Sequence, residues 1–241
     1  MVFYAGASSG VEPLESGDLT SPIITNKDPL PSATDVPKDK VISFHIEDAI
    51  LGVDLSNTTI YVEGNIAYTS SAFQNPYDDS SSITGNANDY TVQIAKDIDW
   101  DSVSTVTVRV VTQDLGTHST DESWDFDIED YIGPLVVPIN PTNGQIEVAL
   151  DSNIQLSISD DDSVEANLIK VEIDSGAGFQ EAFIYSDSPK FKSGFDGPGS
   201  TWQNVGGVYT IVIDPISDFP PSTTIYVRVT ATDPTGNATR I

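Results

Sequence analysis

The sequence predicts an all-β protein in which two β-sandwich domains in tandem follow an extended N-terminal arm. The first observation is an internal repeat. Residues 90–94 (YTVQI) return as residues 209–213 (YTIVI), and residues 108–114 (VRVVTQD) return as residues 227–233 (VRVTATD), both at an offset of 119 residues. The second observation is that apolar and polar residues alternate in short segments, and no segment keeps a helical period. Two copies of one β-rich module therefore account for most of the chain.

The two copies also align upstream, at a smaller offset. At an offset of 112 residues, five positions of the first copy match five of the second: Pro22, Pro29, Ile42, Ile46 and Asp48 match Pro134, Pro141, Ile154, Ile158 and Asp160. The second copy is thus seven residues longer, and we place the extra residues in a long loop or irregular hairpin within residues 186–203. The predicted boundaries are an arm at residues 1–20, domain 1 at 21–130 and domain 2 at 131–241. Each domain is long enough for a core of its own.

The strands of domain 1 are predicted where β-branched and aromatic residues alternate with polar ones between turn-forming residues. These strands are residues 41–46, 59–62, 90–94, 106–110 and 124–128. Alternation of this kind indicates antiparallel sheets with one wet face. About seven short strands in about 110 residues are typical of a β-sandwich.

The strands of domain 2 follow by the repeat, at residues 154–158, 168–173, 209–213 and 225–229. The last strand of domain 1, taken as residues 123–128, would correspond to residue 242 onward. We therefore expect domain 2 to lack its last strand. Either a longer native polypeptide that continues beyond Ile241 or another chain would supply it.

Composition narrows the classes of partner. Thirty-seven acidic and ten basic residues give a formal net charge of −27, which repels phosphate groups, so neither nucleic acid nor an anionic membrane is expected as a partner. Without cysteine, the fold has neither disulfides nor thiolate metal sites. Residues 1–10 lack the basic and long apolar regions of a secretory signal. The chain is expected to be assembled in the cytoplasm or to be a mature piece of a longer protein.

The sequence resembles tandem immunoglobulin-like modules of bacterial surface proteins and phage virion proteins. The resemblance covers residues 21–241 and rests on the prolines Pro22 and Pro134, the Asn140–Pro141 turn and the final turn at residues 233–237 (DPTGN). Domain 1 departs from this pattern at residues 114–118 (DLGTH). The resemblance implies an immunoglobulin-like fold, which hosts many functions.

No catalytic set is evident. The two histidines, His45 and His118, lie in different elements of domain 1, and domain 2 has Ser157 and Asn237 at the matching positions. His45 alternates with inward-facing residues, so it is expected to face solvent. We predict no catalytic residues and no enzymatic activity.

Calcium is the most specific chemical hypothesis, although no cofactor is required. Ca²⁺ prefers carboxylate and carbonyl oxygens supplied by loops. Three loop segments at one pole of domain 2 carry such groups: Glu129, Asp130, Asp160, Asp161, Asp162, Asp233 and Asn237. The alternative is that these residues simply form turns, as Asp and Asn often do.

Two further segments are candidates for contact with partners. Val2, Phe3 and Tyr4 begin the arm, and we expect them to anchor it to a neighbouring subunit. Aromatic residues in and beside the extra segment, Phe191, Phe195, Trp202 and Tyr185, could face a ligand such as a host-surface glycan, or could belong to the core.

These observations favour a non-enzymatic structural or binding protein in a larger oligomeric assembly. The first hypothesis is a phage virion accessory, in a tail, baseplate, fibre or capsid decoration, whose partners are other virion subunits. The alternative is a secreted bacterial surface adhesin or stalk with calcium-stiffened repeats, placed outside the cell among other surface proteins.

Overall fold

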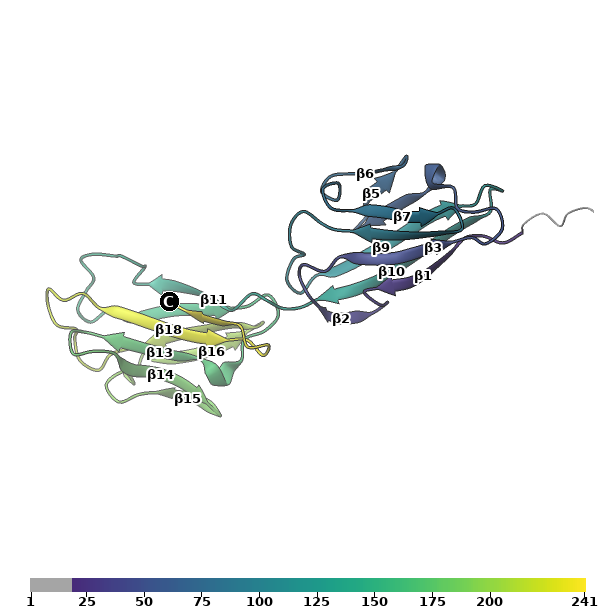
Figure 1. Cartoon of the computed structure of the whole chain (residues 1–241). Coiled ribbons are helices and arrows are strands. Elements are labelled where there is room, and N and C mark those ends of the chain that lie inside the picture. Colours follow the sequence, from purple (N-terminus) through teal and green to yellow (C-terminus); the bar gives the residue numbers. More distant parts are fainter. Residues whose placement is uncertain (1–18) are drawn as a thin grey trace, which may run out of the picture. The chain divides into compact units, whose positions relative to one another are not determined.

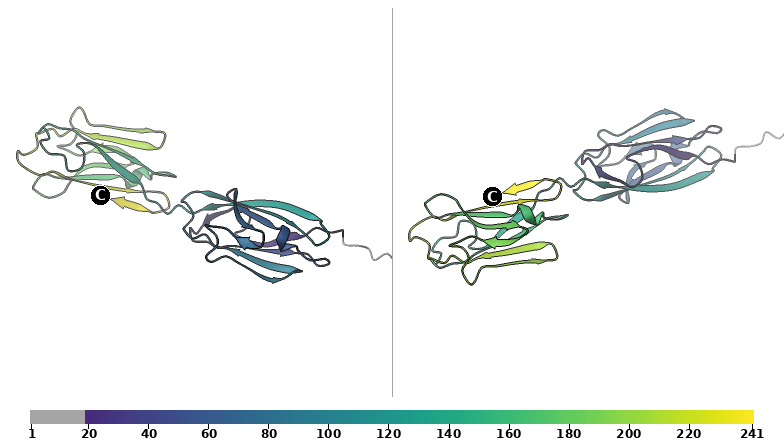
Figure 2. Two further views of the ribbon diagram at one scale, coloured as in Figure 1. Left: turned by 90° about the horizontal axis from the view of Figure 1, so that it is seen from above. Right: turned by 90° about the horizontal axis from the view of Figure 1, so that it is seen from below.

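A computed structural model describes residues 19–241, and the chain divides into two compact units, the first ending at Ile128 and the second spanning Glu129–Ile241. Each unit is a two-layer β-sandwich with an immunoglobulin-like strand order (Figures 1 and 2). The predicted arm contacts of Val2, Phe3 and Tyr4 lie outside the described residues. Among residues 19–241, no helix has the length and apolar character needed to span a membrane.

The first unit contains a four-stranded and a six-stranded sheet. The four-stranded sheet comprises, in spatial order, β1 (Ile23–Asp28), β3 (Ile42–Glu47), β8 (Asp89–Ile94) and β7 (Ser82–Asn86). The other sheet comprises β2 (Ala33–Val36), β10 (Ser119–Ile128), β9 (Thr105–Gln113), β4 (Thr59–Val62), β5 (Asn65–Thr69) and β6 (Ala72–Phe73). A short 3₁₀ helix, η1 (Leu55–Asn57), precedes β4. All pairings are antiparallel except that of β10 with β2, which is parallel.

The core of the first unit lies between the two sheets and follows the predicted alternation. Every second residue of β3 is fully buried, as are the matching residues of β9 on the facing sheet: Ile42, Phe44, Ile46, Val106, Val108 and Val110. Trp124 of β10 meets Phe44 edge to face, with ring centroids 5.3 Å apart. Aromatic pairs of this geometry add to the stabilisation that burial of the rings provides.

The second unit repeats this arrangement. One sheet comprises, in spatial order, β11 (Leu135–Asn140), β12 (Ile154–Ser159), β17 (Val208–Ile213) and β16 (Thr201–Val205). The other comprises β15 (Ser188–Phe191), β14 (Gln180–Ser186), β13 (Lys170–Asp174), β18 (Tyr226–Thr232) and β19 (Ala238–Arg240). The 3₁₀ helix η2 (Ala166–Leu168) precedes β13, so the strand predicted at residues 168–173 begins later than expected.

The last strand of the second unit begins within the described residues, whereas the counterpart of residues 123–128 would start at residue 242, so the expected completion of this strand stays a prediction. Strand β19 begins at Ala238, which matches Ser119, the first residue of β10, at the offset of 119. It pairs with β18, and the backbones of Ile241 and Val229 exchange two hydrogen bonds of 3.1 Å. The sequence did not predict the start of this strand, because Ala238–Arg240 contains no apolar alternation.

The extra residues of the second copy do not form one long loop. Residues 186–203 include most of β15 and β16. The strand registers give offsets of 111, 115 and 118 for three successive pairs of matching residues: Ile60 and Val171, Tyr68 and Phe183, Phe73 and Phe191. The insertion is therefore divided mainly between the β13–β14 and β14–β15 hairpins, where added residues leave the core register intact.

Candidate functional site

Three aspartates meet at one pole of the second unit. Asp160 directly follows β12, Asp233 directly follows β18, and Asp130 lies in the segment that leads into β11. One carboxylate oxygen of each lies within 4.8 Å of one from each of the others. The strands before Asp160 and Asp233 belong to different sheets, so the sandwich itself brings the two carboxylates together.

The turn after β18 fixes the position of Asp233, whose side chain is buried with 1% of its surface exposed. Its Oδ1 accepts hydrogen bonds from the Thr235 hydroxyl (2.8 Å) and from the backbone N–H groups of Gly236 (2.7 Å) and Asn237 (2.8 Å). Gly236 has a φ of +100°, in the region that favours glycine. The turn thus saturates Oδ1, whereas Oδ2 is buried without a hydrogen-bond partner.

Asp160, like Asp233, has one hydrogen-bonded carboxylate oxygen and one that is buried without a partner. Its Oδ1 accepts a hydrogen bond of 3.1 Å from the backbone N–H of Asp162, and its Oδ2 is buried without a partner. Buried polar atoms almost always have a hydrogen-bond partner, and leaving one unpaired costs about 1–3 kcal/mol, more for a charged group. Two such oxygens in one small cluster therefore require an explanation.

Asp130 is attached to the same turn by its backbone and its side chain. Asn237 donates from Nδ2 to the backbone carbonyl of Asp130 (3.1 Å), and the Thr235 hydroxyl lies 3.4 Å from Asp130 Oδ2. The Asp130 Oδ1 accepts from the backbone N–H of Ile132 (3.1 Å). These contacts hold the segment before β11 against the β18–β19 turn.

The electrostatics of the two buried carboxylates differ. Burial raises the pKa of Asp160, and the nearby charges of Asp130, Asp161 and Asp233 add to this effect. For Asp233, burial also acts to raise the pKa, but the hydrogen bonds from Thr235, Asn237 and Gly236 outweigh it and lower the pKa overall. A bound divalent cation would stabilise the ionised form of both groups and would fill the coordination of their free oxygens.

The structure thus brings together three of the seven residues predicted to bind calcium. Asn237 lies beside them and binds the backbone of Asp130. The other three, Glu129, Asp161 and Asp162, lie outside the three-residue cluster, and the last two are exposed. Of these, Asp162 acts through its backbone N–H, which orients Asp160.

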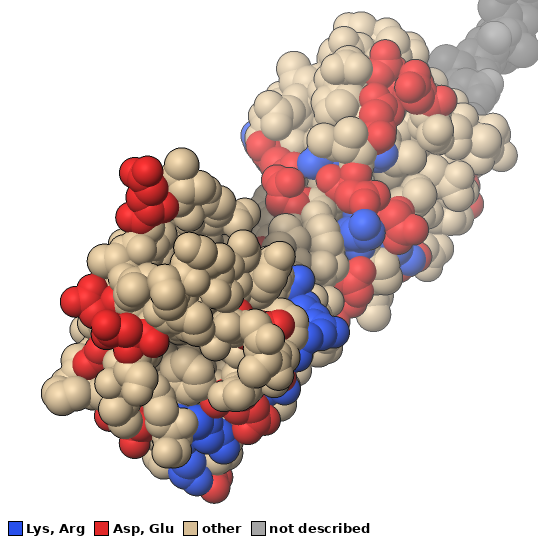
Figure 3. All heavy atoms as spheres, turned by 90° about the vertical axis from the view of Figure 1, so that its left-hand side faces the viewer, with Lys and Arg blue, Asp and Glu red and all other residues tan. Residues whose placement is uncertain are grey.

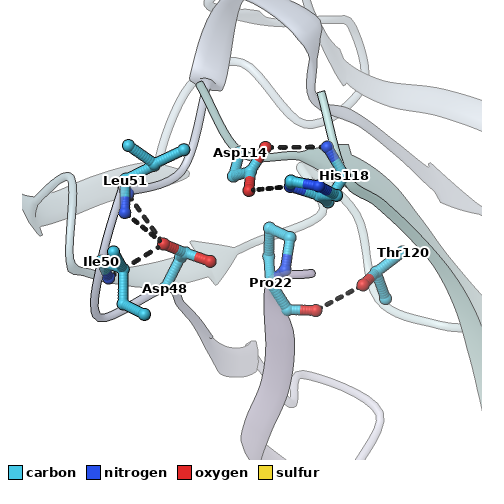
Figure 4. A network of polar contacts seen from close by, with 8 residues as sticks. Pro22, Asp48, Ile50, Leu51, Asp114, His118 and Thr120 are labelled. Carbon is cyan, nitrogen blue, oxygen red and sulfur yellow. Dashed lines mark hydrogen bonds and ion pairs between the residues drawn. The ribbon is translucent and has the colours of Figure 1, made fainter. Parts of the chain in front are cut away.

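The matching pole of the first unit is closed by a histidine. Asp114 matches Asp233, and His118 matches Asn237, both at the offset of 119. The fully buried Asp114 accepts hydrogen bonds from the backbone N–H of His118 at Oδ1 (2.8 Å), while its Oδ2 lies 2.8 Å from His118 Nδ1 (Figure 4). The imidazole therefore serves the oxygen that has no partner in Asp233.

Asp48, which matches Asp160, is also satisfied differently. Its Oδ1 accepts from the backbone N–H groups of Ile50, Leu51 and Gly52 (Figure 4). In the same pole, the Thr120 hydroxyl donates to the carbonyl of Pro22. Sequence reasoning assigned His118 only to a turn. Its pairing with Asn237 in the repeat was the one available signal of a different role.

Burial acts to raise the pKa of Asp114, but the hydrogen bonds from the His118 side chain and backbone outweigh it, so its pKa lies below the ordinary value. In the first unit, a side chain of the same unit, His118, thus stabilises the ionised form of the buried carboxylate. In the second unit, the same position offers a free oxygen.

The aromatic residues proposed to face a ligand pack against the core of the second unit. Phe191, Phe195 and Trp202 are all partly buried there. The Trp202 ring lies between those of Tyr185 and Tyr209, with centroids 5.4 and 5.9 Å away. This placement favours the alternative that they belong to the core.

No protein-family model and no curated protein matches the chain. Among solved structures, the chain is similar to the tandem immunoglobulin domains DIP-gamma IG1+IG2, with 10% identity, a TM-score of 0.45 and coverage of 92% of this chain and 95% of that one. It is also similar to the titin tandem domains A164-A165, with 11% identity, a TM-score of 0.35 and coverage of 92% and 93%. CopC from Methylosinus trichosporium OB3b covers 46% of this chain and 96% of its own, with 10% identity and a TM-score of 0.32.

Proposed function

We propose that this protein is a non-enzymatic structural component of a larger assembly, in which the second immunoglobulin-like unit binds a calcium ion at its pole. The observation that carries the calcium site is the pair of buried carboxylate oxygens without partners, on Asp160 and Asp233. Asp130 supplies a third carboxylate from the segment before β11. Waters would complete the six to eight oxygen ligands that Ca²⁺ requires.

A structural role is supported by how the two histidines are used. His118 holds Asp114, and His45 contacts Asp89 and Thr91 on a sheet surface. The hydroxyl beside His45 belongs to Thr91, a residue within strand β8, rather than to a sharp turn that would project it as a nucleophile. The acidic side chains form several separate groups on the visible surface, with basic side chains beside some of them (Figure 3), as on a solvated structural module.

The calcium site is tested by following thermal unfolding of the full chain with calcium and with a chelator. A ligand that binds only the folded state stabilises it by about 2.7 kcal/mol at a hundred times its Kd. We expect calcium to raise the unfolding temperature of the second unit and to leave that of the first unit unchanged. The lack of any shift in the second unit at millimolar calcium would refute the site.

For the assembly, we propose a phage virion accessory protein. Antibodies raised against the chain should label purified phage particles, and labelling of intact cells alone would overturn this assignment. A secreted surface adhesin or stalk is the second candidate. The cation site favours it, since modules that work outside cells use calcium sites with Kd values of about 10⁻⁴–10⁻³ M.

A further inference from the structure

A second group of metal-ligand side chains lies on the outer face of a sheet in the first unit. His45 and Glu47 are two residues apart on β3, so they project from the same face, and Asp89 of β8 lies directly opposite Glu47. One ligand atom of each residue lies within 4.8 Å of those of the other two. His45 Nδ1 is 2.9 Å from Asp89 Oδ1 and 4.0 Å from Glu47 Oε1. None of these residues belongs to the pole described above.

Two threonines support this group from the same face. The hydroxyl of Thr25 donates to Glu47 Oε1, and Thr91 Oγ1 lies 3.3 Å from His45 Nε2. With the proton on Nδ1, the imidazole donates to Asp89; with the proton on Nε2, the lone pair of Nδ1 faces the Asp89 carboxylate at 2.9 Å. Two acceptors at this distance need a proton or a cation between them. Oriented second contacts of this kind are typical of histidine and carboxylate metal ligands.

The second unit shows that the fold itself does not require these side chains. The same strand register places Ser157, Ser159 and Val208 at the matching positions of β12 and β17. All three potential ligands are thus absent from the second copy, while the sheet and its core remain. The group is therefore specific to the first unit.

We propose that His45, Glu47 and Asp89 form a binding site for a zinc ion. An imidazole nitrogen with two carboxylates is a ligand set that Zn²⁺ accepts, with one position left for water, whereas Ca²⁺ takes oxygen ligands. Tetrahedral ligands about 2.0–2.1 Å from zinc lie roughly 3.3 Å from one another. The 2.9 and 4.0 Å separations bracket this value, and small rotations of the half-buried His45 and Glu47 and of the exposed Asp89 close the difference.

The test is isothermal titration of the full chain with zinc chloride in buffer saturated with calcium, so that the pole of the second unit is occupied. We expect one zinc ion per chain and a loss of affinity of more than about tenfold in His45→Ala. Asp125→Asn, an exposed aspartate of β10 on the other sheet, is the matched control and should bind like the wild type. Co²⁺ should replace zinc and show a visible absorption band that His45→Ala lacks.

A gain-of-site variant makes the test independent of any loss of folding. Ser157→His, Ser159→Glu and Val208→Asp together place the same ligands on the matching sheet of the second unit, and we expect two zinc ions per chain. Absence of zinc uptake by the wild type, or unchanged affinity in His45→Ala, would overturn the proposal. Because calcium is present at saturation throughout, either result would count against the zinc site alone. The proposed calcium site of the second unit is tested separately, by its own unfolding experiment.

Discussion

At the scale of single residues, the two copies of the module differ most clearly in how they neutralise one buried aspartate. The Asp114 oxygen that faces His118 has as its counterpart an Asp233 oxygen without a partner. At this position the first unit supplies an imidazole of its own, and in the second unit the proposed calcium ion would take its place. A buried carboxylate needs hydrogen-bond donors or a cation, because desolvation penalises its charge.

Exchanging these residues should exchange the behaviour of the two units. Asn237→His is expected to raise the unfolding temperature of the second unit in chelator and to reduce its response to calcium. His118→Asn is expected to lower the unfolding temperature of the first unit by several degrees, because Asp114 loses its partner. Calorimetry with and without calcium checks both. An Asn237→His protein that responds to calcium like the wild type would contradict the assignment.

The effect of Asp160→Asn on the stability of the second unit should change sign when calcium is added. In chelator we expect it to stabilise the second unit, because it removes a buried charge, and in calcium it should abolish the gain. The pKa of Asp160 is raised in the folded state. The destabilisation caused by its buried charge is therefore absent below pH 3.8, the ordinary pKa, and appears as the pH rises through the folded pKa. The advantage of the variant in chelator should therefore shrink in acid. Asp151→Asn, exposed in the same unit, is the control and should have no effect in either condition.

At the scale of elements, the pairing of β13 with β18 includes a nearly buried ion pair. Glu172 and Arg228 lie directly opposite, with Arg228 Nε 2.7 Å from Glu172 Oε2, and Lys170 Nζ lies 3.0 Å from Glu172 Oε1. The Arg228 hydrogen bond, aided by Lys170 and opposed by burial, lowers the pKa of Glu172 to about 2. The carboxylate therefore contributes to the stability of this strand pair.

Glu172→Gln should destabilise the second unit by roughly 2 kcal/mol at neutral pH, a value that allows for partial screening by solvent. The pKa of Glu172 is lower in the folded state than in the unfolded state. Its contribution to stability is therefore complete above about pH 4.5 and is lost as the pH falls towards 2. Urea unfolding across this range measures it. Glu181→Gln, which breaks an exposed pair with Lys192, should cost little at any pH.

In the first unit, β10 contributes its aromatic face to the core. Trp124 has 5% of its surface exposed and packs on Phe44, so Trp124→Ala should cost about 3–5 kcal/mol and lower the urea midpoint of the first unit only. The exposed neighbour Ser123 provides the control, since Ser123→Ala leaves the core intact. Equal losses in the two variants would show that β10 does not hold this part of the core.

At the scale of the whole molecule, the net charge of −27 works against folding of either unit through repulsion among like charges. Raising sodium chloride from about 0.01 to 0.15 M shortens the Debye length from about 30 to 8 Å. In chelator, we expect both unfolding temperatures to rise. Calcium at matched ionic strength should add a further rise in the second unit alone. A salt response as selective as that of calcium would show that the pole does not bind calcium specifically.

The sequence alone was enough to predict two β-sandwich modules, because alternation in a strand such as Ile42–Glu47 records which residues face a core. It missed edge strands such as β7 and β19, in which no residue is buried. Their position depends on pairing with a central strand, which no local pattern records.

The acidic pole was also predictable in outline, since the loops that carry Asp160 and Asp233 follow from the strand order. Only the tertiary structure decided which oxygens there are satisfied and which are not. Hydrogen-bond satisfaction at this pole depends on three segments that are distant in the sequence, whereas alternation is a property of neighbouring residues. For the same reason, the substitution of His118 for Asn237 gained its meaning only when the folded turn placed the imidazole against Asp114.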